Sequence, residues 1–389
     1  MPVRPQPSPS TPDEFDVALI FIPAFDLGGT ERQTIELLRG LRALPETDRG
    51  RIELVVIRSG GPLEADAMAT GFPVHSLGNT SALSLPRTAA RWIRLVRQRR
   101  PSAVYSLLSS ANFIAAATRL VARPRRLVWG IRDDRLGVER RGVGRFLAIN
   151  GTRLLARIAD VVIVNSDAVR DGLRSSGLNR VPIEVIPNGI DTDRFRPSSE
   201  LRILERERLG VSDDQLIVCV ARLVPKKNHS MLLHAFADLH QQMPSTRLLC
   251  FGDGPDDYRR ELESLVRELG LTDIASLERS RNDPEAIFNA ADLAVLASDA
   301  EGFPNTIAEA LACGTPCVST MVGAAPALLD ADSVSPVGDT AALTRTMIAA
   351  HGRIDTDGRP RDSRLADCFT LGALARRTVD VLQGRSVRD

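Results

Sequence analysis

The chain contains 389 residues, of which 43% are hydrophobic and 25% are charged. Single hydrophobic cores stop growing at about 250–300 residues, so this length predicts an ordinary globular protein with two domains. The longest apolar runs, such as 17–22 and 161–164, are much shorter than the roughly 20 residues of a membrane-spanning helix, so we expect no transmembrane segment.

The five cysteines are an odd number without closely spaced pairs, which argues against a disulfide framework or a zinc site. A metal site at Cys313 and Cys317, which are four residues apart, is a minor alternative. We therefore expect no metal and no cofactor. Residues 1–13 contain proline and serine where a signal peptide needs an apolar run, which predicts a disordered tail and a cytoplasmic protein.

Charge is unevenly distributed along the chain. Residues 1–195 contain 28 arginines and 20 acidic residues, whereas residues 196–389 contain 22 basic and 29 acidic residues. The basic excess is densest in residues 85–145, with 15 arginines against 3 acidic residues. Such a surface can face an anionic membrane or a phosphate group, or it can be a solvated arginine-rich face. The segment has few aromatic residues and no recognised module, so we expect no nucleic-acid partner.

In the first half, apolar runs of strand length alternate with segments of helical period, a pattern typical of parallel βαβ units. The predicted strands are 16–22, 52–57, 103–107, 126–130 and 160–165. Helices lie between them, for example at 87–98 and 111–122, and the helix after the first strand is expected to carry a capping box formed by Thr30 and Gln33. Residues 183–197 predict a strand that runs into an interdomain linker.

The second half repeats the pattern. Its predicted strands lie near 215–221, 246–251, 274–277, 293–297 and 316–319. Its predicted helices lie near 229–241, 256–268, 284–290 and 305–313. The sequence thus predicts an α/β fold in which two Rossmann-like, doubly wound domains, over 14–190 and 191–370, face each other across a cleft. The segment 371–389, with a helix at about 371–383, would pack back on the first domain.

The chain has 48 arginines but only two lysines, Lys226 and Lys227, which are adjacent in a loop between a predicted strand and helix. Arg222 and Lys227 would lie at the carboxyl end of a parallel strand, where α/β sheets bind ligands, and Asn228 is a candidate N-cap. An ammonium beside a guanidinium can neutralise the charge that grows on a departing diphosphate. We interpret the loop as a diphosphate site; the alternative is a pair of surface lysines.

A second candidate site lies where a predicted strand ends in a glycine- and proline-containing loop and a helix begins near Asn305. Gly302 permits close approach of the backbone, and Asn305 is a suitable N-cap. The free amides of the first helical turn would form an anion site aligned with the helix dipole. Glu301 and Glu309 flank this turn, although Glu309 could serve helix electrostatics alone.

Six segments together resemble a known family. They are DLGGTERQTIELLRGL near the start, VNSDAVRDGL at 164–173, EVIPNGIDTDRFRP at 184–197, ARLVPKKNHSMLLHAF at 221–236, FGDGP at 251–255 and EGFPNTIAEALACGTPCV at 301–318. In this order they resemble the retaining glycosyltransferases of the GT-B fold, in the family-four group of bacterial glycan and glycolipid enzymes. The resemblance spans roughly residues 16–385 and implies the GT-B architecture for the two domains.

The resemblance also implies roles for single residues. Arg222, Lys227 and Glu301 would be the catalytic residues, of which the first two would grip the donor diphosphate and Glu301 would contact the donor sugar. Glu309 would accept hydrogen bonds from the ribose hydroxyls. The donor would also contact the loop that follows Glu301, which is Gly302, Phe303, Pro304, Asn305 and Thr306.

The resemblance implies roles for further residues, for which the matching segments are shorter. Gly28 and Gly29 match a glycine turn that approaches the phosphates or the acceptor, and Arg281 lies in the segment that borders the nucleobase. Arg132 stands where many relatives have a histidine. We interpret Arg132 as a cleft residue that touches the donor or the acceptor; the alternative is ion pairing with the two aspartates that follow it.

The implied reaction is the retaining transfer of a hexosyl or N-acetylhexosaminyl group from a nucleoside diphosphate sugar, without a metal or an enzyme nucleophile. UDP is the preferred nucleotide and GDP the second choice. The acceptor would be a glycan or a lipid-linked molecule in the biosynthesis of a cell-surface polysaccharide, such as lipopolysaccharide or exopolysaccharide, with the basic segment 85–145 against the inner face of the cell membrane. The alternatives are a non-catalytic sugar-nucleotide-binding protein and an epimerase or phosphorylase of the same architecture.

Overall fold

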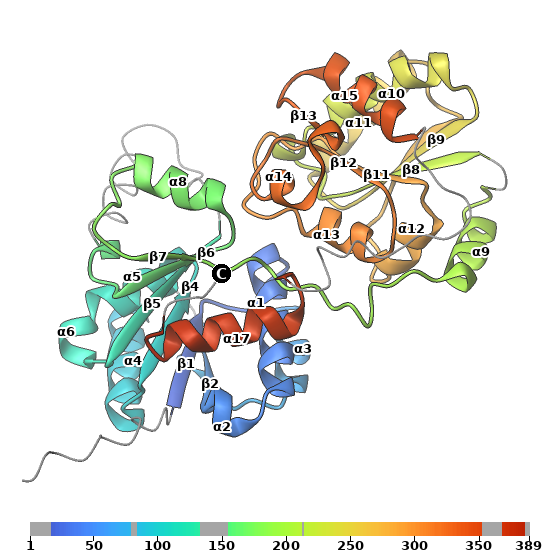
Figure 1. Cartoon of the computed structure of the whole chain (residues 1–389). Helices are drawn as coiled ribbons and strands as arrows, with labels where there is room; N and C mark the ends of the chain where they lie inside the picture. The colour runs from blue at the N-terminus through green and yellow to red at the C-terminus, as the bar shows by residue number, and fades with distance from the viewer. Residues whose placement is uncertain (1–16, 79–83, 133–154, 212–213, 352–367, 386–389) are drawn as a thin grey trace, which may run out of the picture.

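A computed structural model describes residues 17–78, 84–132, 155–211, 214–351 and 368–385, which form two separate parallel sheets with helices packed against them (Figure 1). The first sheet has the order β3-β2-β1-β4-β5-β6-β7 and the second the order β10-β9-β8-β11-β12-β13. All strand pairs in the described part of the chain are parallel. The predicted α/β fold with two Rossmann-like domains is confirmed.

The first domain contains the strands β1 Val17–Ile22, β2 Arg51–Val56, β3 Val74–Ser76, β4 Ala103–Leu107, β5 Arg126–Ile131, β6 Val161–Val164 and β7 Ile183–Val185. Its helices are α1 Gly29–Ala43, α2 Glu46–Arg49, α3 Glu64–Ala69, α4 Leu85–Arg99, α5 Ser109–Ala117, α6 Arg119–Ala122 and α8 Asp167–Ser175. All six residues of β1 are buried, as expected for a strand covered on both faces of its sheet.

The second domain contains β8 Gln215–Val220, β9 Thr246–Phe251, β10 Ala275–Glu278, β11 Leu293–Leu296, β12 Cys317–Thr320 and β13 Val334–Ser335. Its helices are α9 Ser199–Arg208, α10 His229–Gln242, α11 Asp256–Glu268, α12 Pro284–Ala290, α13 Asn305–Ala312, α14 Ala325–Leu328 and α15 Thr340–His351, with short 3-10 turns at Pro225–Lys227 and Ala331–Ser333. None of the helices in the described part of the chain is long and apolar enough to span a bilayer.

Strand order reverses once in each sheet, between β1 and β4 in the first and between β8 and β11 in the second. At such a reversal the flanking loops diverge to opposite faces, which opens a crevice at the carboxyl ends of the strands. The loops after β1 and β4 therefore border one crevice, and the loops after β8 and β11 border the other. These four loops carry most of the residues of the site described below.

Two helix starts differ from the predictions. α1 begins at Gly29 with Gly28 as its N-cap, so the predicted capping box of Thr30 and Gln33 is wrong. α13 begins at Asn305 with Pro304 at the N-cap position, so Asn305 is the first residue of the helix rather than its cap. The side chains of Gln33 and Asn305 instead form hydrogen bonds with distant segments, as described below.

The predicted helix 111–122 is divided into α5 and α6 at Thr118. Asn228 does cap α10: its side chain accepts a hydrogen bond from the amide of Met231, and its backbone has a left-handed φ of 50°. Asparagine tolerates this conformation better than most residues.

The last helix, α17 Leu371–Leu382, returns to the first domain and lies against α1 (Figure 1). The contact is close, because a Cβ atom at Gly40 of α1 would lie 2.3 Å from the carbonyl oxygen of Leu371. Leu374 is buried in the core of the first domain. Next to this helix the linker from the first domain passes the returning chain, where the amide of Ile190 donates to the carbonyl of Phe369 over 2.7 Å.

Candidate active site

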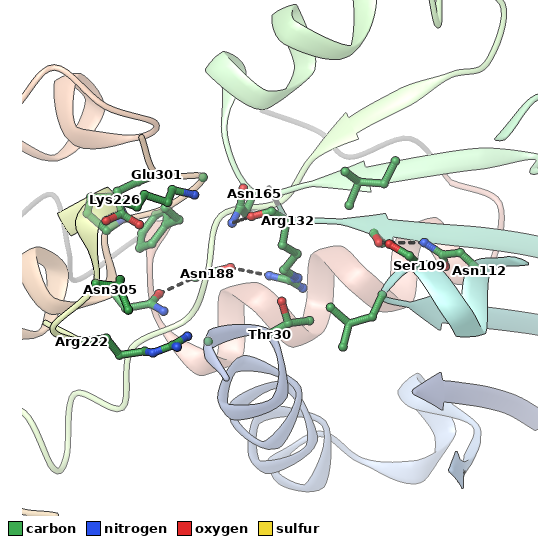
Figure 2. A pocket seen from close by; sticks show the side chains of 18 of the residues that line it. Thr30, Ser109, Asn112, Arg132, Asn165, Asn188, Arg222, Lys226, Glu301 and Asn305 are labelled. Atoms are coloured by element: carbon green, nitrogen blue, oxygen red, sulfur yellow. Dashed lines mark hydrogen bonds between the residues drawn. The ribbon is translucent and has the colours of Figure 1, made fainter. Parts of the chain in front are cut away.

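A cavity of about 620 Å³ lies between the two domains (Figure 2). The first domain contributes the start of α1, the junction of β4 with α5, and the ends of β5 and β6. The second contributes the loop after β8 and the loop that leads from β11 into α13. The predicted residues that line it are Gly29, Arg132, Arg222, Lys227, Glu301, Gly302, Phe303, Pro304, Asn305 and Thr306.

The two loops of the second domain are bound to each other by polar contacts. Lys227 Nζ lies 2.5 Å from Glu301 Oε1, which also accepts a hydrogen bond of 2.6 Å from the hydroxyl of Ser298. Asn228 donates to the carboxylate of Asp299 over 2.8 Å. The Lys227 and Glu301 side chains are 22% and 12% exposed, so the pair faces the cavity from a largely desolvated position.

Arg222 adds a second cation to this wall of the cavity. It follows the end of β8 and is exposed, and no residue in the described part of the chain forms a salt bridge with its guanidinium. The guanidinium of Arg222 and the ammonium of Lys227 lie in the same loop, and together they suit the oxygens of a diphosphate. The first turn of α13 adds the positive end of a helix dipole beside them.

Gly302 lies in close contact with the backbone of the first domain. A Cβ atom there would be 2.3 Å from the carbonyl oxygen of Arg132 and 2.9 Å from the side-chain oxygen of Asn165. No other residue type fits without moving the domains apart. The next residue, Phe303, is buried with its ring centroid 5.8 Å from that of Phe369.

Glu309 is four residues after Asn305, and therefore lies on the same face of α13 one turn further from the cavity. It is largely buried and is not among the residues that line the cavity. Burial raises the pKa of its carboxyl group to about 7, although the positive charges of Arg32 and Arg194 oppose the rise. The side chain is thus poised to lose or gain a proton near neutral pH.

Arg132 follows β5 and lines the cavity, and its contacts are with polar groups of other segments. Its guanidinium donates to the side-chain oxygen of Asn188 and, over 3.3 Å, to the hydroxyl of the buried Tyr105. Asn188 in turn donates to the side-chain oxygen of Asn305 over 2.8 Å. The two aspartates that follow Arg132, considered above as its ion-pair partners, lie outside the described residues.

Gly28 and Gly29 lie where β1 passes into α1. Gly29 lines the cavity, and a Cβ atom there would be 4.0 Å from Asn305 Nδ2 of the opposite domain. Gly28 does not line it, but its Cβ position is occupied by the carboxylate of Glu31, at 2.2 Å. Gly28 therefore leaves room for the Glu31 side chain at the start of α1, and Gly29 faces the second domain across the cavity.

Two family models match this chain. The model described as "Glycosyltransferase Family 4" matches residues 27–194, and the model described as "Glycosyl transferases group 1" matches residues 214–351. Together they cover every residue that lines the cavity, and both sheets except β1. The chain belongs to glycosyltransferase family 4.

Curated relatives of this glycosyltransferase act on sugar nucleotides or inositol-containing acceptors, according to their names. The GDP-mannose-dependent alpha-(1-6)-phosphatidylinositol monomannoside mannosyltransferase of Mycolicibacterium smegmatis is 29% identical over 332 residues, which cover 78% of this chain and 85% of the relative. The D-inositol 3-phosphate glycosyltransferase of the same organism is 36% identical over 184 residues, 46% of this chain and 41% of the relative.

Solved structures share the fold of this glycosyltransferase at lower identity. The UDP complex of Anabaena Alr3699/HepE has a TM-score of 0.81 and 22% identity, and the match covers 94% of this chain and 99% of that one. WaaG, a glycosyltransferase involved in lipopolysaccharide biosynthesis, has a TM-score of 0.66 and 17% identity, with coverage of 95% and 100%. Both likenesses support the GT-B architecture.

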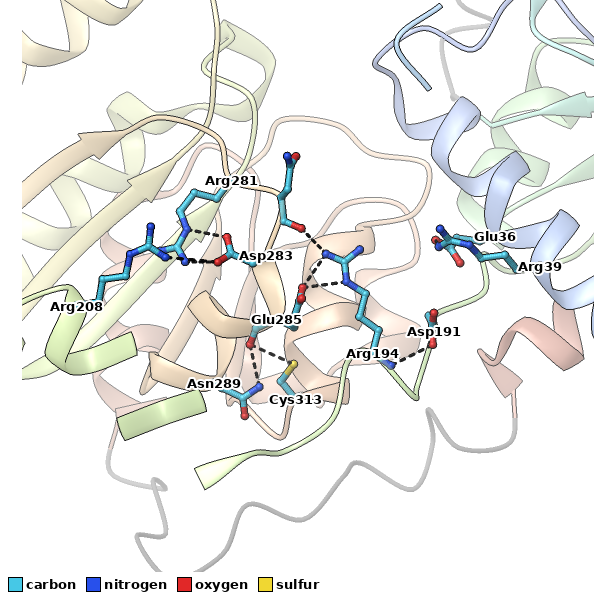
Figure 3. A network of polar contacts seen from close by, with 11 residues as sticks. Glu36, Arg39, Asp191, Arg194, Arg208, Arg281, Asp283, Glu285, Asn289 and Cys313 are labelled. Carbon is cyan, nitrogen blue, oxygen red and sulfur yellow. Dashed lines mark hydrogen bonds and ion pairs between the residues drawn. The ribbon is translucent and has the colours of Figure 1, made fainter. Parts of the chain in front are cut away.

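Arg281 is not among the residues that line the cavity of this glycosyltransferase. It belongs to the network of polar contacts shown in Figure 3. Its guanidinium is held by the carboxylates of Glu205 and Asp283, which raise its pKa further, and it lies 6.0 Å from the ring centroid of Phe251. A guanidinium enclosed by two carboxylates serves local structure. That the segment around Arg281 borders the nucleobase stays a prediction.

Sequence reasoning missed the residues that join the two domains. Asn188 and Gln33 are 3% and 4% exposed, and Gln33 both donates to and accepts from the backbone of Gly189 over 3.2 Å. Asn188 lies in the segment EVIPNGIDTDRFRP, to which the family resemblance assigns no role. The signal that could have found it is a polar amide between two apolar stretches in a predicted linker.

Proposed function

We propose that this glycosyltransferase transfers a hexosyl or N-acetylhexosaminyl group, with retention of configuration, from a nucleoside diphosphate sugar to a glycan or lipid-linked acceptor. The observation that carries the proposal is the convergence of Arg222, Lys227 and the start of α13 on one wall of an interdomain cavity. The opposite wall, built by the first domain, leaves room for an acceptor.

In the proposed reaction, the bond from the anomeric carbon to the diphosphate oxygen breaks and a bond to an acceptor oxygen forms on the same face of the sugar. Arg222, Lys227 and the dipole of α13 stabilise the charge that develops on the departing diphosphate. A diphosphate oxygen takes the proton from the acceptor hydroxyl. Positive charge therefore comes from the protein, and the proposal requires neither a metal ion nor a covalent enzyme intermediate.

The resting ion pair of Lys227 and Glu301 supports this arrangement. Because both side chains are largely buried, their charges are less screened than on a surface. The pair holds the ammonium within reach of a diphosphate, while Glu301 keeps a second oxygen for a sugar hydroxyl. Near-complete closure at Gly302 would exclude water that could otherwise hydrolyse the donor.

The donor nucleotide is expected to be UDP or GDP. The family resemblance favours UDP, and the HepE structures, with which this chain shares the fold, hold UDP or UDP-glucose. The curated relative with 78% coverage is named for GDP-mannose. Direct comparison of UDP-glucose with GDP-mannose is therefore the first measurement of donor choice.

The acceptor side of the first domain supports a lipid-linked acceptor at an anionic membrane. The arginines of α4 all lie on exposed positions, while the helix buries Thr88, Trp92 and Val96. Nearby apolar side chains are also exposed: Phe113 of α5 is 51% and Leu120 of α6 is 85% exposed. Because Phe113 also lines the cavity, this surface is continuous with the site. We place the enzyme at the cytoplasmic face of the membrane, in the biosynthesis of a cell-surface polysaccharide.

The test is calorimetric titration of the purified protein with UDP, GDP and ADP and with their sugar conjugates, in the presence of a metal chelator. The proposal expects one nucleotide to bind, and expects Lys227→Ala to lose that binding. Arg267→Ala, on an exposed position of α11, is the matched charge control and should bind like the wild type. Binding without turnover on any lipid or glycan acceptor would favour a binding protein, and no binding would overturn the proposal.

A further inference from the structure

A line of hydrogen bonds crosses the domain interface beside the cavity (Figure 2). It begins at Tyr105 in β4, passes through Arg132 after β5 and Asn188 in the linker, and ends at Asn305 in the first turn of α13. Tyr105 and Asn188 are 0% and 3% exposed. The line connects the sheet of the first domain to the helix that begins at the donor wall of the cavity.

The chemistry of these groups allows only one direction for the line. A guanidinium donates hydrogen bonds and accepts none, so the amide of Asn188 must present its oxygen to Arg132. The side-chain nitrogen of Asn188 then donates to Asn305, whose side-chain oxygen must be the acceptor. The nitrogen of Asn305 consequently faces the cavity, on the side of Arg222 and Thr30 in Figure 2.

The backbone that carries Asn188 is fixed in place. Gln33 holds the amide and carbonyl of Gly189 with two hydrogen bonds of 3.2 Å. A Cβ atom at Gly189 would lie 3.1 Å from Leu374 of α17, so the returning helix also confines this segment. Asn188 therefore cannot move away from Arg132 and Asn305 without breaking contacts with two helices.

We propose that Arg132 and Asn188 are positioning residues that set the polarity of the Asn305 amide, so that its NH₂ group faces the cavity as a hydrogen-bond donor to the diphosphate or sugar oxygens of the donor. The inference rests on the proposed function, because it requires a donor with such oxygens on this wall. It assigns to the linker a part in donor recognition, although neither Arg132 nor Asn188 needs to touch the diphosphate.

The substitution that tests polarity is Asn188→Asp. A carboxylate still accepts from Arg132, but it cannot donate to Asn305, so the Asn305 amide should rotate and present its oxygen to the cavity. The nucleotide sugar then loses a hydrogen bond from the Asn305 amide to one of its charged oxygens, and the amide oxygen repels that oxygen instead. Donor binding should therefore weaken by about 10- to 100-fold. Asn188→Ala leaves Asn305 free to choose either orientation and should weaken binding less than Asn188→Asp.

A double-mutant cycle separates rotation of Asn305 from the added negative charge. Dissociation constants for UDP-glucose and GDP-mannose are measured for the wild type, Asn188→Asp, Asn305→Ala and the double variant, with thermal melting of each protein. The proposal expects Asn188→Asp to have little further effect once Asn305 is alanine. A merely structural role would instead lower the melting temperature without this dependence on Asn305.

The outcomes distinguish the two proposals. If the wild type binds neither donor, both the proposed function and this inference fail. If the wild type binds one of them and Asn188→Asp weakens binding equally with and without the Asn305 amide, the inference alone is overturned. Should Asn188→Asp fail to fold, the same cycle is performed with Asn188→Ala, for which an effect that survives in the Asn305→Ala background overturns the inference.

Discussion

The raised pKa of Glu309 predicts that donor affinity depends on pH near neutrality. If the carboxylate accepts hydrogen bonds from the donor ribose, only its ionised form binds well. Burial raises the pKa to about 7. Protonation below that value then weakens binding by the factor by which the ionised fraction falls. Between pH 8 and pH 6 this fraction falls about tenfold, so the dissociation constant should rise about tenfold.

The assay is titration with the nucleotide sugar rather than the free nucleotide, because a diphosphate esterified at both ends does not itself ionise in this range. Titration at pH 7 in two buffers with different ionisation enthalpies should show release of about half a proton on binding. Glu309→Gln, which keeps the shape and removes the ionisation, is the matched control. An affinity that is flat between pH 6 and pH 8, or a Glu309→Gln variant with the same pH dependence as the wild type, would refute the reasoning.

Three further outcomes are expected. Lys227→Ala should lower turnover by at least about 100-fold without changing the melting temperature greatly, and near-normal turnover in a steady-state assay would contradict its assigned part. Gly302→Ala should lower kcat/KM by about tenfold or more, since its Cβ atom would collide with the carbonyl of Arg132 across the interface. Unchanged kinetics would show that the reaction does not require the contact between the domains seen at Gly302. Trp92→Ala should destabilise the first domain by about 3–5 kcal/mol in chemical denaturation, because its buried ring stacks on Phe21 at 4.1 Å; a loss below about 1 kcal/mol would contradict this packing.

Charge reversal in α4 and at the residue that follows it tests membrane contact separately from catalysis. Arg94 and Arg100 are exposed, and substituting both with glutamate should abolish co-sedimentation with vesicles rich in anionic lipid while donor binding is retained. Equal binding of the variant and the wild type to these vesicles would remove the support for an acceptor supplied by a membrane.

The fold was predictable because each central strand is an apolar run with a well-defined end. β1 and β8 are buried on both faces, and their following loops contain the glycines and lysines that mark the two crevices. The edge strands β3 and β13, of three and two residues, escaped prediction. The edge strand β7 is as short as β3 but was predicted, because it lies in the apolar segment IEVI that ends at a proline. Short edges depend on pairing with a neighbour rather than on their own sequence.

The site was predictable where its residues are close in sequence, and hidden where they are not. Arg222, Lys227 and Glu301 lie in loops with a readable strand–loop–helix pattern. Gln33, by contrast, has a spacing from Thr30 that also fits a capping box, and its actual partner is 156 residues away. Asn305 has the composition of a cap but is used across the domain interface. Local sequence cannot distinguish a cap from a long-range contact, because both require the same polar side chain.

The return of α17 to the first domain has a mechanical consequence. The chain passes between the domains twice, and the two passages run side by side where Ile190 pairs with Phe369 and Thr370. One connecting segment would leave the relative position of the domains loosely constrained. Two segments that are hydrogen-bonded to each other constrain it at the point where they meet. Phe369 also packs on Phe303 of the second domain, next to Gly302, so the point where the two passages meet lies beside the wall of the cavity. The relative position of the two domains is thus fixed by the same few residues that border the site.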